Sequence, residues 1–490
     1  MVLSPLRNIP AYAFIEFLNN RDLINLASSN HYFKLELYHK AKPFVHSNSP
    51  AHAIRILTFF KHAKLKISSG ELFDESKDIK PLMNNIIEIH LDEHMLKLFD
   101  DIKLSELRNL TSLDIDEDFP IADIIIPSTI KQLTLDTLDQ GKEIKSVLFT
   151  NLTSLDICYG FVTDSILAQL TKLTKLDIYD ETPITNHGLS KLINLKQLDL
   201  TDIQSDKITD EGICPLTNLT ALFIHGTRYI SDDIFKHLQK LLELSITGDT
   251  IITDRGIYHC INLRSLTLYG PHIKITDITM QRLTNLTSLD ISSLKLTDKA
   301  LIGLEALVFL GSGDNEITDD ACKHLTNIKS LDLSLDEKLT DKILTSGLTS
   351  LNISSNDRIT DEGLRSLIQL QKLSLYHNVK ITDYGLETLG PSLISLKLYE
   401  NENVTDRGIC GLTNLLYLNI SGNKKITDMG ILPLKKLKRL DLGRSVGTTN
   451  VTFECVCSFR HLRNVVGVHR IANMDKEKRK FLGRRGIILV

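Results

Sequence analysis

A series of acidic or amide residues, each directly after a threonine or serine, recurs along the chain. Carboxylates of this kind bind divalent cations and act in acid–base catalysis, provided that several converge on one pocket. Here twelve steps separate positions 164 and 428, a mean of 22 residues per step, so we expect the carboxylates one repeat apart along a rim. We therefore predict helix capping by Thr-Asp, which supplies acceptors for unpaired amides. The series is Asp164, Asn186, Asp210, Asp232, Asp254, Asp277, Asp298, Asp319, Asp341, Asp361, Asp383, Asp406 and Asp428.

Other residue types that could act in catalysis or bind a metal form no recognisable catalytic pattern. The seven cysteines include no C-x-x-C pair, and the sixteen histidines are scattered. The pair Cys455-x-Cys457 has no partner at metal-ligand spacing, so we interpret the cysteines as small buried thiols of a reducing compartment. Phosphate-binding loops, nucleophile elbows, H-E-x-x-H and dinucleotide fingerprints are also absent from the sequence. We expect no catalytic residue, no metal, no cofactor and no enzymatic activity.

The bulk composition places further limits on function. The chain has 490 residues, 42% hydrophobic and 24% charged, with a formal net charge of −4. This near-neutral balance argues against a nucleic-acid partner, because nucleic-acid binders carry a basic excess. No apolar run approaches the roughly 18 residues of a membrane span, and the first residues lack a signal-peptide pattern. We predict a soluble intracellular protein, cytoplasmic or nuclear, without a membrane or nucleic-acid partner.

The elements that position these side chains follow from the same period of about 22 residues. Between successive Thr-Asp pairs runs Leu-x-x-Leu-x-Leu, whose alternation predicts a short strand with both final leucines in the core. The next apolar residues, as in Gly363-Leu364-x-x-Leu367, return at helical spacing. Each repeat is therefore predicted to be a strand followed by a short helix, and neighbouring repeats must stack to bury their leucines.

This pattern resembles the leucine-rich repeat family, and its recurring motif Ile-Thr-Asp-x-Gly-Leu looks like that of the cysteine-containing subclass. Four copies extend the motif to Leu-x-x-Leu-x-Leu-x-x-Asn, ending at Asn356, Asn378, Asn401 and Asn423. The resemblance implies an α/β solenoid, a horseshoe with a parallel concave sheet and short convex helices. Because strands stack about 4.8 Å apart and helices about 8–10 Å apart, the stack must curve, and convex helices of two turns would make the curvature moderate.

The pattern also predicts the divisions of the chain. We expect a small all-α head at 1–48, degenerate leucine-rich repeats at 49–150 and regular repeats at 151–445. Residues 446–490 would hold the last repeat and a C-terminal cap. A basic cluster in this last segment is interpreted either as a nuclear-import or phosphate patch or as the polar face of a capping helix. The cluster is Lys476, Lys478, Arg479, Lys480, Arg484 and Arg485.

The head resembles an F-box, on the order Ile9-Pro10, Phe14, Phe17-Leu18, Asp22-Leu23, Leu26 and Phe33. That resemblance implies that these residues bind a Skp-type adaptor, which links the protein to a cullin ubiquitin ligase. The sequence departs from the family pattern in lacking the acidic residue after Pro10 and in placing Ser29 at an aliphatic position. The spacing from Pro10 to Asp22 is also about one helical turn short of the family pattern. The alternative is a helical cap that only seals the solenoid.

Positions between the strand leucines are predicted to face the concave side, where a partner would bind. Two groups differ from the rest. An acidic strip would suit a basic segment, and an aromatic patch has the composition of interface hot spots; alternatively, small polar residues keep an open sheet soluble. The acidic group is Asp156, Asp177, Asp180 and Asp199, and the aromatic group is Tyr376, His377, Lys397, Tyr399 and Tyr417.

These patterns support two hypotheses about function. The first is an adaptor without catalysis of its own, the substrate-recognition subunit of a Skp–cullin–F-box ubiquitin ligase whose concave face holds an unidentified protein substrate. The second is a stand-alone leucine-rich repeat scaffold with no ligase connection. Only the head separates them.

Overall fold

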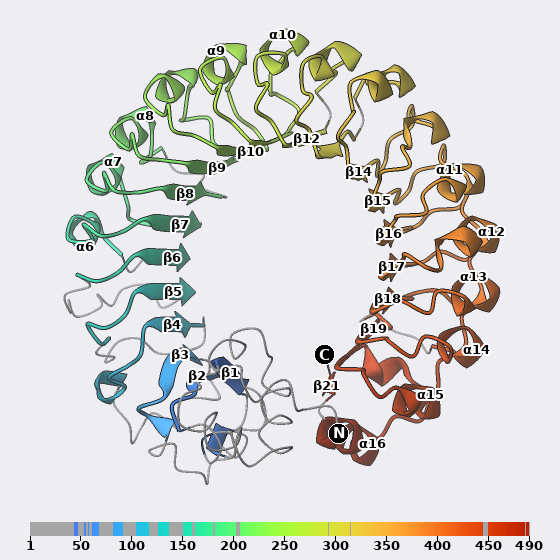
Figure 1. The fold of residues 1–490 in the computed structure, drawn as a ribbon. Coiled ribbons are helices and arrows are strands. Elements are labelled where there is room, and N and C mark those ends of the chain that lie inside the picture. The colour runs from blue at the N-terminus through green and yellow to red at the C-terminus, as the bar shows by residue number, and fades with distance from the viewer. Residues whose placement is uncertain are drawn as a thin grey trace, which may run out of the picture. The chain divides into compact units, whose positions relative to one another are not determined.

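The computed structural model forms two compact units, Met1–Lys240 and Leu241–Val490 (Figure 1). The residues that it describes are 44–47, 53–54, 57, 61–67, 82–91, 104–116, 126–136, 150–158, 162–179, 182–201, 206–292, 294–313, 315–443, 449–485 and 487–489. The F-box-like residues 9–33 therefore lie outside the described part of the chain. So does Asp180 of the predicted acidic group.

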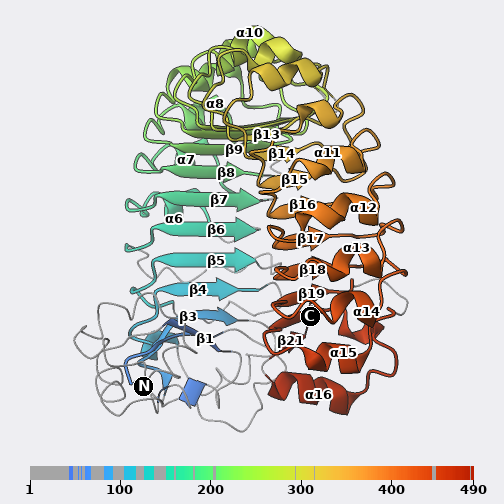
Figure 2. The ribbon, with the colours of Figure 1, turned by 45° about the vertical axis from the view of Figure 1, so that its right-hand side comes forward.

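The first unit contains parallel strands that pair in chain order, each with the next (Figure 2). Four of them occupy the degenerate region in which the sequence predicted solenoid strands. The strands are β1 (Phe44–Ser47), β2 (Lys64–Ile67), β3 (Ile86–Leu91), β4 (Ser112–Ile115), β5 (Gln132–Asp136), β6 (Ser154–Cys158), β7 (Lys175–Tyr179), β8 (Gln197–Leu200) and β9 (Ala221–His225). The helices are η4 (Leu104–Glu106), α6 (Asp164–Leu167), α7 (Asn186–Leu189), α8 (Asp210–Ile213) and η5 (Asp232–Lys236).

The second unit repeats this arrangement, and its strands also pair in parallel in chain order. The strands are β10 (Glu243–Thr247), β11 (Ser265–Tyr269), β12 (Ser288–Ser292), β13 (Phe309–Gly311), β14 (Ser330–Asp332), β15 (Ser350–Asn352), β16 (Lys372–Ser374), β17 (Ser395–Lys397), β18 (Tyr417–Asn419), β19 (Arg439–Asp441), β20 (Asn464–Val466) and β21 (Ile488–Leu489). The helices are α9 (Asp254–Ile257), α10 (Asp277–Met280), η6 (Asp298–Leu301), η7 (Asp319–Lys323), η8 (Asp341–Ile343), α11 (Asp361–Arg365), α12 (Asp383–Leu386), η9 (Glu387–Leu389), α13 (Asp406–Cys410), α14 (Asp428–Ile431), α15 (Phe453–Ser458), η10 (Val468–Arg470) and α16 (Lys476–Arg484).

The convex helices are shorter than the sequence pattern suggested. Most have four or five residues, as in α12 and α13, which is a single turn and not the two turns expected. After the strand, its turn and the connection back to the next strand, a repeat of about 22 residues leaves room for one turn only. The apolar residue expected in a second turn, such as Leu367, instead follows the helix in a tight turn and is still buried.

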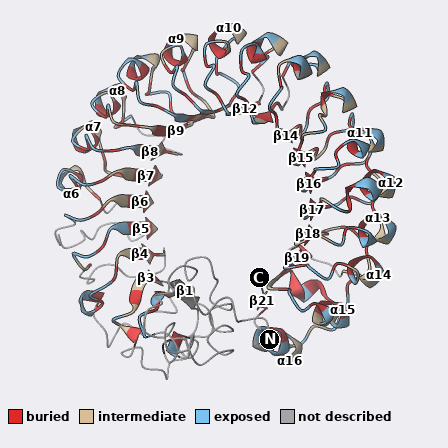
Figure 3. Cartoon of the chain, in the orientation of Figure 1, coloured by how far each residue is buried: buried red, intermediate tan, exposed pale blue. Residues whose placement is uncertain are grey.

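The core lies between the strands and the convex helices of each unit (Figure 3). Paired strand leucines such as Leu373 and Leu375 are 2% and 0% exposed, and the leucines of the helices, such as Leu364, are equally buried. The sheet face turned away from this core, which we call the concave face, carries the intervening polar side chains. The strand alternation predicted from Leu-x-Leu is thus confirmed.

The recurring Thr-Asp pair does more than cap its own helix. Thr382 behaves as predicted, since its hydroxyl accepts the amide of Tyr384 at the start of α12. The aspartate differs from the prediction: Asp383 accepts the backbone N–H and the hydroxyl of Thr405 in the next repeat, both at 2.7 Å. The same pair of bonds joins consecutive repeats from Asp254–Thr276 to Asp428–Thr452. The recurring carboxylates are therefore links between repeats.

A glycine two residues after the aspartate leaves space for this link between repeats. A Cβ on Gly385 would lie 2.4 Å from Asp361 Oδ1, and one on Gly408 would lie 2.4 Å from Asp383 Oδ1. Some repeats with another residue at this position, such as Ala300 or Ile343, form 3-10 turns, whereas α6 with Ile166 and α10 with Thr279 are α-helical. Thr, Asp and Gly thus form one interlocking device between neighbours.

A second ladder lies beyond the ends of β15, β16, β17 and β18 in the second unit. The amide of the buried Asn378 donates to the carbonyls of Ile353 and Asn356, and its oxygen accepts the amides of Lys380 and Ile381. Asn356, Asn401 and Asn423, which the sequence motif identified, bond in the same manner. Each asparagine satisfies buried backbone groups that would otherwise destabilise the turn.

The C-terminal segment packs on the last repeat. Asp475 caps α16 by accepting the amide of Lys478, Leu482 is buried, and Arg485 donates to the carbonyls of Cys457 and Phe459. Lys476 and Arg479 are exposed. This basic cluster therefore combines one side chain used for packing with others on the surface.

Candidate functional site

The carboxylates of the first unit are aligned by the strand register. Asp114 on β4 pairs with Thr134 on β5, and Asp156, Asp177 and Asp199 then occupy the same position on β6, β7 and β8. Neighbouring strands lie about 4.8 Å apart, so the last three carboxylates are stacked at that spacing. Asp136 stands two positions further along β5. We call Asp114, Asp136, Asp156, Asp177 and Asp199 the acidic strip.

Partial burial, with repulsion added, raises the pKa of three carboxylates of the acidic strip. Burial, followed by the charge of Asp177, raises the pKa of Asp156 to about 6. Burial also raises the pKa of Asp136, with added repulsion from Asp116 and Asp114. The pKa of Asp199 is likewise raised by burial, although hydrogen bonds from Thr201 oppose the shift. The ionised form of these three carboxylates is therefore less stable in this environment than in water.

Asp177 lies at the centre of the stacked carboxylates and is only partly satisfied. Its side chain is 6% exposed, and its Oδ2 is 2.5 Å from Lys175 Nζ on the same strand. Its Oδ1 is buried and has no hydrogen-bond partner. A buried carboxylate oxygen without a donor is unfavourable, so this atom is a vacant acceptor within the acidic strip.

Few cations face the acidic strip from the described strands. Besides Lys175, His90 on β3 lies 2.8 Å from Asp114 and 3.8 Å from Asp116. The sequence prediction of the acidic group did not include Asp114, and it also missed Asp136, Lys175 and His90. Alternation at i and i+2 on β7 would have placed Lys175 on the face of Asp177.

The aromatic group of the second unit is only partly brought together. The rings of Tyr376 and Tyr399 stack with their centroids 4.4 Å apart and 6° between planes, and His377 meets both edge-on. His377 and Glu400 face each other at 3.3 Å. Both adopt positive φ angles, 50° and 49°, which cost non-glycine residues about 1 kcal/mol or more each. The same turn position has a positive φ in other repeats, as at Leu335 and Ser355, so this conformation belongs to the repeat. The stacked tyrosine rings are the feature that distinguishes this surface.

Tyr417 and Lys397 occupy other positions on the sheet. Tyr417 aligns with Ser395 at the start of β17, four residues before the position equivalent to Tyr399, and Arg439 lies over its ring at 5.5 Å. Burial raises the pKa of Tyr417. Lys397 is exposed at the position between the paired leucines. The structure thus separates Tyr417 from the stacked pair.

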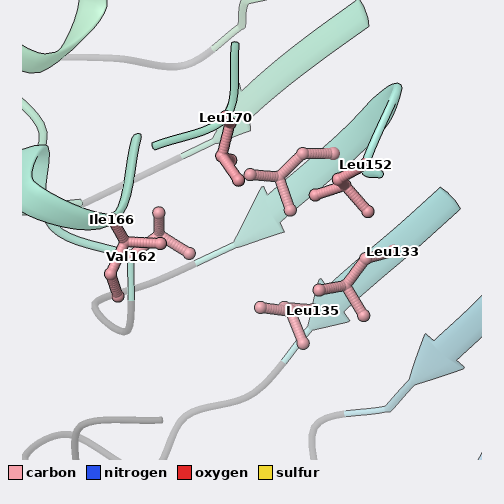
Figure 4. A pocket seen from close by; sticks show the side chains of 7 residues that line it. Leu133, Leu135, Leu152, Val162, Ile166 and Leu170 are labelled. Atoms are coloured by element: carbon pink, nitrogen blue, oxygen red, sulfur yellow. The ribbon is translucent and has the colours of Figure 1, made fainter. Parts of the chain in front are cut away.

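Metal, cavity and membrane features add little in the described part of the chain. No cluster of three or more His, Cys, Asp or Glu in these residues is arranged to hold a metal ion. An apolar cavity of about 10 Å³ lies between β5, β6 and α6 and is lined by Leu133, Leu155, Val162 and Ile166, among others (Figure 4). This volume is about that of one water molecule, and its apolar lining offers that molecule no partner. Of the helices described, none has the length and apolarity required to cross a bilayer.

Two of the six cysteines described match the expectation of buried thiols, while Cys158, Cys214 and Cys457 are only half-buried. Cys260 and Cys455 are buried, and burial raises the pKa of each thiol to about 12. Cys410, at the end of α13, is exposed and does not fit that interpretation. It faces solvent because it stands in the last turn of a one-turn convex helix.

Comparisons with known proteins bear on the fold. A family model described as Leucine Rich repeat matches residues 348–367 and 411–435. No curated protein sequence matches the chain significantly. The Rad7–Elc1 complex of yeast is similar at 21% identity over 59% of this chain and 81% of that chain, with a TM-score of 0.41. A leucine-rich repeat protein of Leptospira interrogans is similar at 25% identity over 70% and 90%, with a TM-score of 0.45. An internalin of Listeria monocytogenes is similar at 25% identity over 65% and 82%, with a TM-score of 0.36.

The two stretches matched by the family model contain β15 with α11 and β18 with α14, one complete strand–helix unit each. The same unit recurs through both halves of the described chain. The two matched stretches are therefore leucine-rich repeats, and the rest of the described array is built from the same strand–helix unit. All three structural likenesses have TM-scores below 0.5, so a finer function has to be inferred from the residues of this chain.

Proposed function

We propose that this leucine-rich repeat protein is an adaptor that holds a protein substrate on its concave face. Through its F-box-like head, it would deliver that substrate to a Skp-type adaptor and a cullin ubiquitin ligase. The observation that carries substrate binding is the incomplete satisfaction of the concave face. Asp177 Oδ1 lacks a donor among the described residues, and the stacked rings of Tyr376 and Tyr399 stand on the second unit, with Tyr376 exposed. Buried acceptors without donors and exposed aromatic side chains are typical of binding surfaces.

The ligase connection is supported by the order of residues in the head. Phe17-Leu18 followed by Asp22-Leu23 resembles the adaptor-binding core of an F-box, and a leucine-rich array follows it directly. In this arrangement the head would contact the ligase and the array would contact the substrate. Two binding surfaces on one chain would bring the substrate to the ligase without any catalytic residue here.

A second candidate function is a stand-alone scaffold that binds its partner without a ligase. It is favoured by the departures of the head from the F-box pattern, namely the missing acidic residue after Pro10 and Ser29 at an aliphatic position. In that case the head would be a cap on the first repeats.

Co-expression of the full chain with a Skp-type adaptor and a cullin tests the ligase connection. The unmodified chain is expected to capture the adaptor, and Leu18→Ala with Leu23→Ala to lose it. Leu6→Ala, a matched change outside the F-box-like order, should retain capture. Failure of the unmodified chain to bind the adaptor would refute the ligase function in favour of the scaffold.

A substrate-face variant separates the two surfaces. Combined Tyr376→Ala and Tyr399→Ala should leave adaptor capture unchanged while weakening retention of substrate proteins. If the same variant abolished adaptor capture, the division of labour between head and concave face would be wrong.

A further inference from the structure

The acidic strip has an excess of acceptors over donors among its described neighbours. Asp156 faces Asp177 and Lys175 on β7, Asp136 on β5 and Asp114 on β4. Lys175 is already within 2.5 Å of Asp177, and His90 within 2.8 Å of Asp114. Tyr179 lies beside the strip on β7. Burial and the charges of Asp199, Asp156 and Asp177 raise the pKa of its phenol, so this side chain stays neutral. Five carboxylates thus face two groups capable of positive charge.

Charge excess alone is common on protein surfaces, but Asp177 supplies an independent observation. Its side chain is almost completely buried, yet Oδ1 accepts no hydrogen bond. Lys175 occupies only Oδ2. An oxygen of this kind is satisfied by an incoming N–H donor, and ammonium and guanidinium groups are the donors that carry the complementary charge.

We propose that the acidic strip is the docking site for an extended, Lys/Arg-rich segment of the partner protein, lying across β4 to β8. This inference rests on the proposed function, because it names the chemistry of the substrate held on the concave face. It excludes nucleic acids and other polyanions as occupants, because the strip would repel them.

The geometry sets the spacing of the basic side chains. Four strand intervals of about 4.8 Å separate Asp114 from Asp199, about 19 Å in all. An extended segment rises about 3.3 Å per residue, so roughly six residues span that distance. Alternate residues point to the same side, about 6.6 Å apart. A segment with arginine or lysine at every second position would therefore reach the ends and centre of the strip.

Docking of this kind should release protons in mildly acidic solution. Below pH 6 a fraction of the free chains holds a proton on Asp156, and a bound cation would displace it. If the bound state has Asp156 fully ionised, the affinity should rise about tenfold from about pH 5 to about pH 7 and then level off. An imidazole, that of His90, also lies beside Asp114, so the pH dependence must be assigned with a variant of Asp156.

The test is fluorescence anisotropy of the full chain with a labelled peptide of roughly nine residues, arginine alternating with threonine. The matched probe replaces each arginine with the neutral isostere citrulline. The arginine peptide should bind, and the citrulline peptide should not. Combined Asp156→Asn, Asp177→Asn and Asp199→Asn should weaken binding about tenfold or more. Asp357→Asn, the same change at an exposed position outside the strip, should leave affinity unchanged.

The pH series supplies the second readout. Asp156→Asn alone should flatten the affinity between about pH 5 and about pH 7, whereas His90→Gln should retain most of the slope. Circular dichroism of each variant checks that the repeats remain folded. Equal affinity of the triple variant and Asp357→Asn for the arginine peptide would overturn the proposal.

Self-association would overturn it differently. If the free chain sediments as a dimer that the triple variant dissociates, the occupant is a second copy, with the basic surface of α16 as its counterpart. Adaptor capture by the head is measured separately. Loss of peptide binding with intact adaptor capture refutes only the basic segment, and loss of adaptor capture with intact peptide binding refutes only the ligase connection.

Discussion

Replacing Gly385 by alanine tests whether the Thr-Asp-x-Gly motif locks neighbouring repeats together. Alanine normally stabilises a helix interior by about 0.5–1 kcal/mol relative to glycine. Here the added Cβ would lie 2.4 Å from Asp361 Oδ1 and 3.1 Å from its Cγ. Relief requires the two repeats to separate, or Asp361 to leave the amide and hydroxyl of Thr382, which it now holds at 2.9 and 2.7 Å.

The magnitude follows from these opposing effects. Overpacking of a well-fitted contact costs about 1–3 kcal/mol, which exceeds the gain in helix propensity. We expect Gly385→Ala to lower the free energy of unfolding by about 1–2 kcal/mol and to convert α12 to the 3-10 form seen with Ala300. Asp361→Ala should cost about 1–3 kcal/mol, because it leaves the donors of Thr382 unpaired.

The double variant is the decisive measurement. Without the carboxylate, the nearest contact left to the new methyl group is the Cα of residue 361 at 3.2 Å, which a shift of a few tenths of an ångström relieves. Asp361→Ala with Gly385→Ala should therefore be little less stable than Asp361→Ala alone. The interaction energy of the cycle is then about 2 kcal/mol, measured by urea unfolding and by local hydrogen exchange in the two repeats. Gly483→Ala is the matched control, because a Cβ there has no neighbour within 4 Å; it should be neutral or stabilising. Additive costs in the cycle would refute the interlock.

Two further predictions concern the core and the acidic strip. Leu373→Ala should cost about 2–5 kcal/mol, and hydrogen exchange should show the loss in β15 to β17 and not in distant repeats, because coupling is between nearest neighbours. Asp156→Asn should stabilise the chain above about pH 6, by about 1 kcal/mol once solvent screening is counted, and have little effect near about pH 4. The folded pKa is raised, so ionisation destabilises the folded state as pH rises between these values, and a uniform effect in urea unfolding at both pH values would contradict this.

The repeat pattern predicted the fold well because each leucine reports on its own immediate surroundings. Alternation on a strand and helical spacing afterwards are local properties, and stacking follows because one repeat cannot bury its leucines. The role of Asp383 was missed for the complementary reason. Its partner, Thr405, belongs to the next repeat, and capping rules consider only the helix in which the residue stands. Only the fixed period, read together with the glycine, could have indicated a bond between repeats.

The candidate site was predictable in position and less so in detail. The column that contains Asp156, Asp177 and Asp199 follows from strand register, which the period fixes. The burial of Asp177 and its pairing with Lys175 depend on how neighbouring side chains pack, and no spacing rule gives that. Tyr417 was grouped with Tyr399 by composition, yet it occupies a different strand position. The head residues 9–33 lie outside the described chain and remain predictions.

The division of roles within one repeat explains why binding chemistry gathers on the strands. The Thr, Asp and Gly residues of the Thr-Asp-x-Gly motif hold neighbouring repeats together, since each contacts the adjacent repeat. The strand leucines are committed to the core. The side chains between those leucines lie on the other face of the sheet, outside the core, so they vary from Asp177 to Lys397 while the leucines recur. An unsatisfied carboxylate is tolerated at Asp177 because the surrounding interlocks hold its strand in register, and the same rigidity would hold the acidic strip in place for a basic partner.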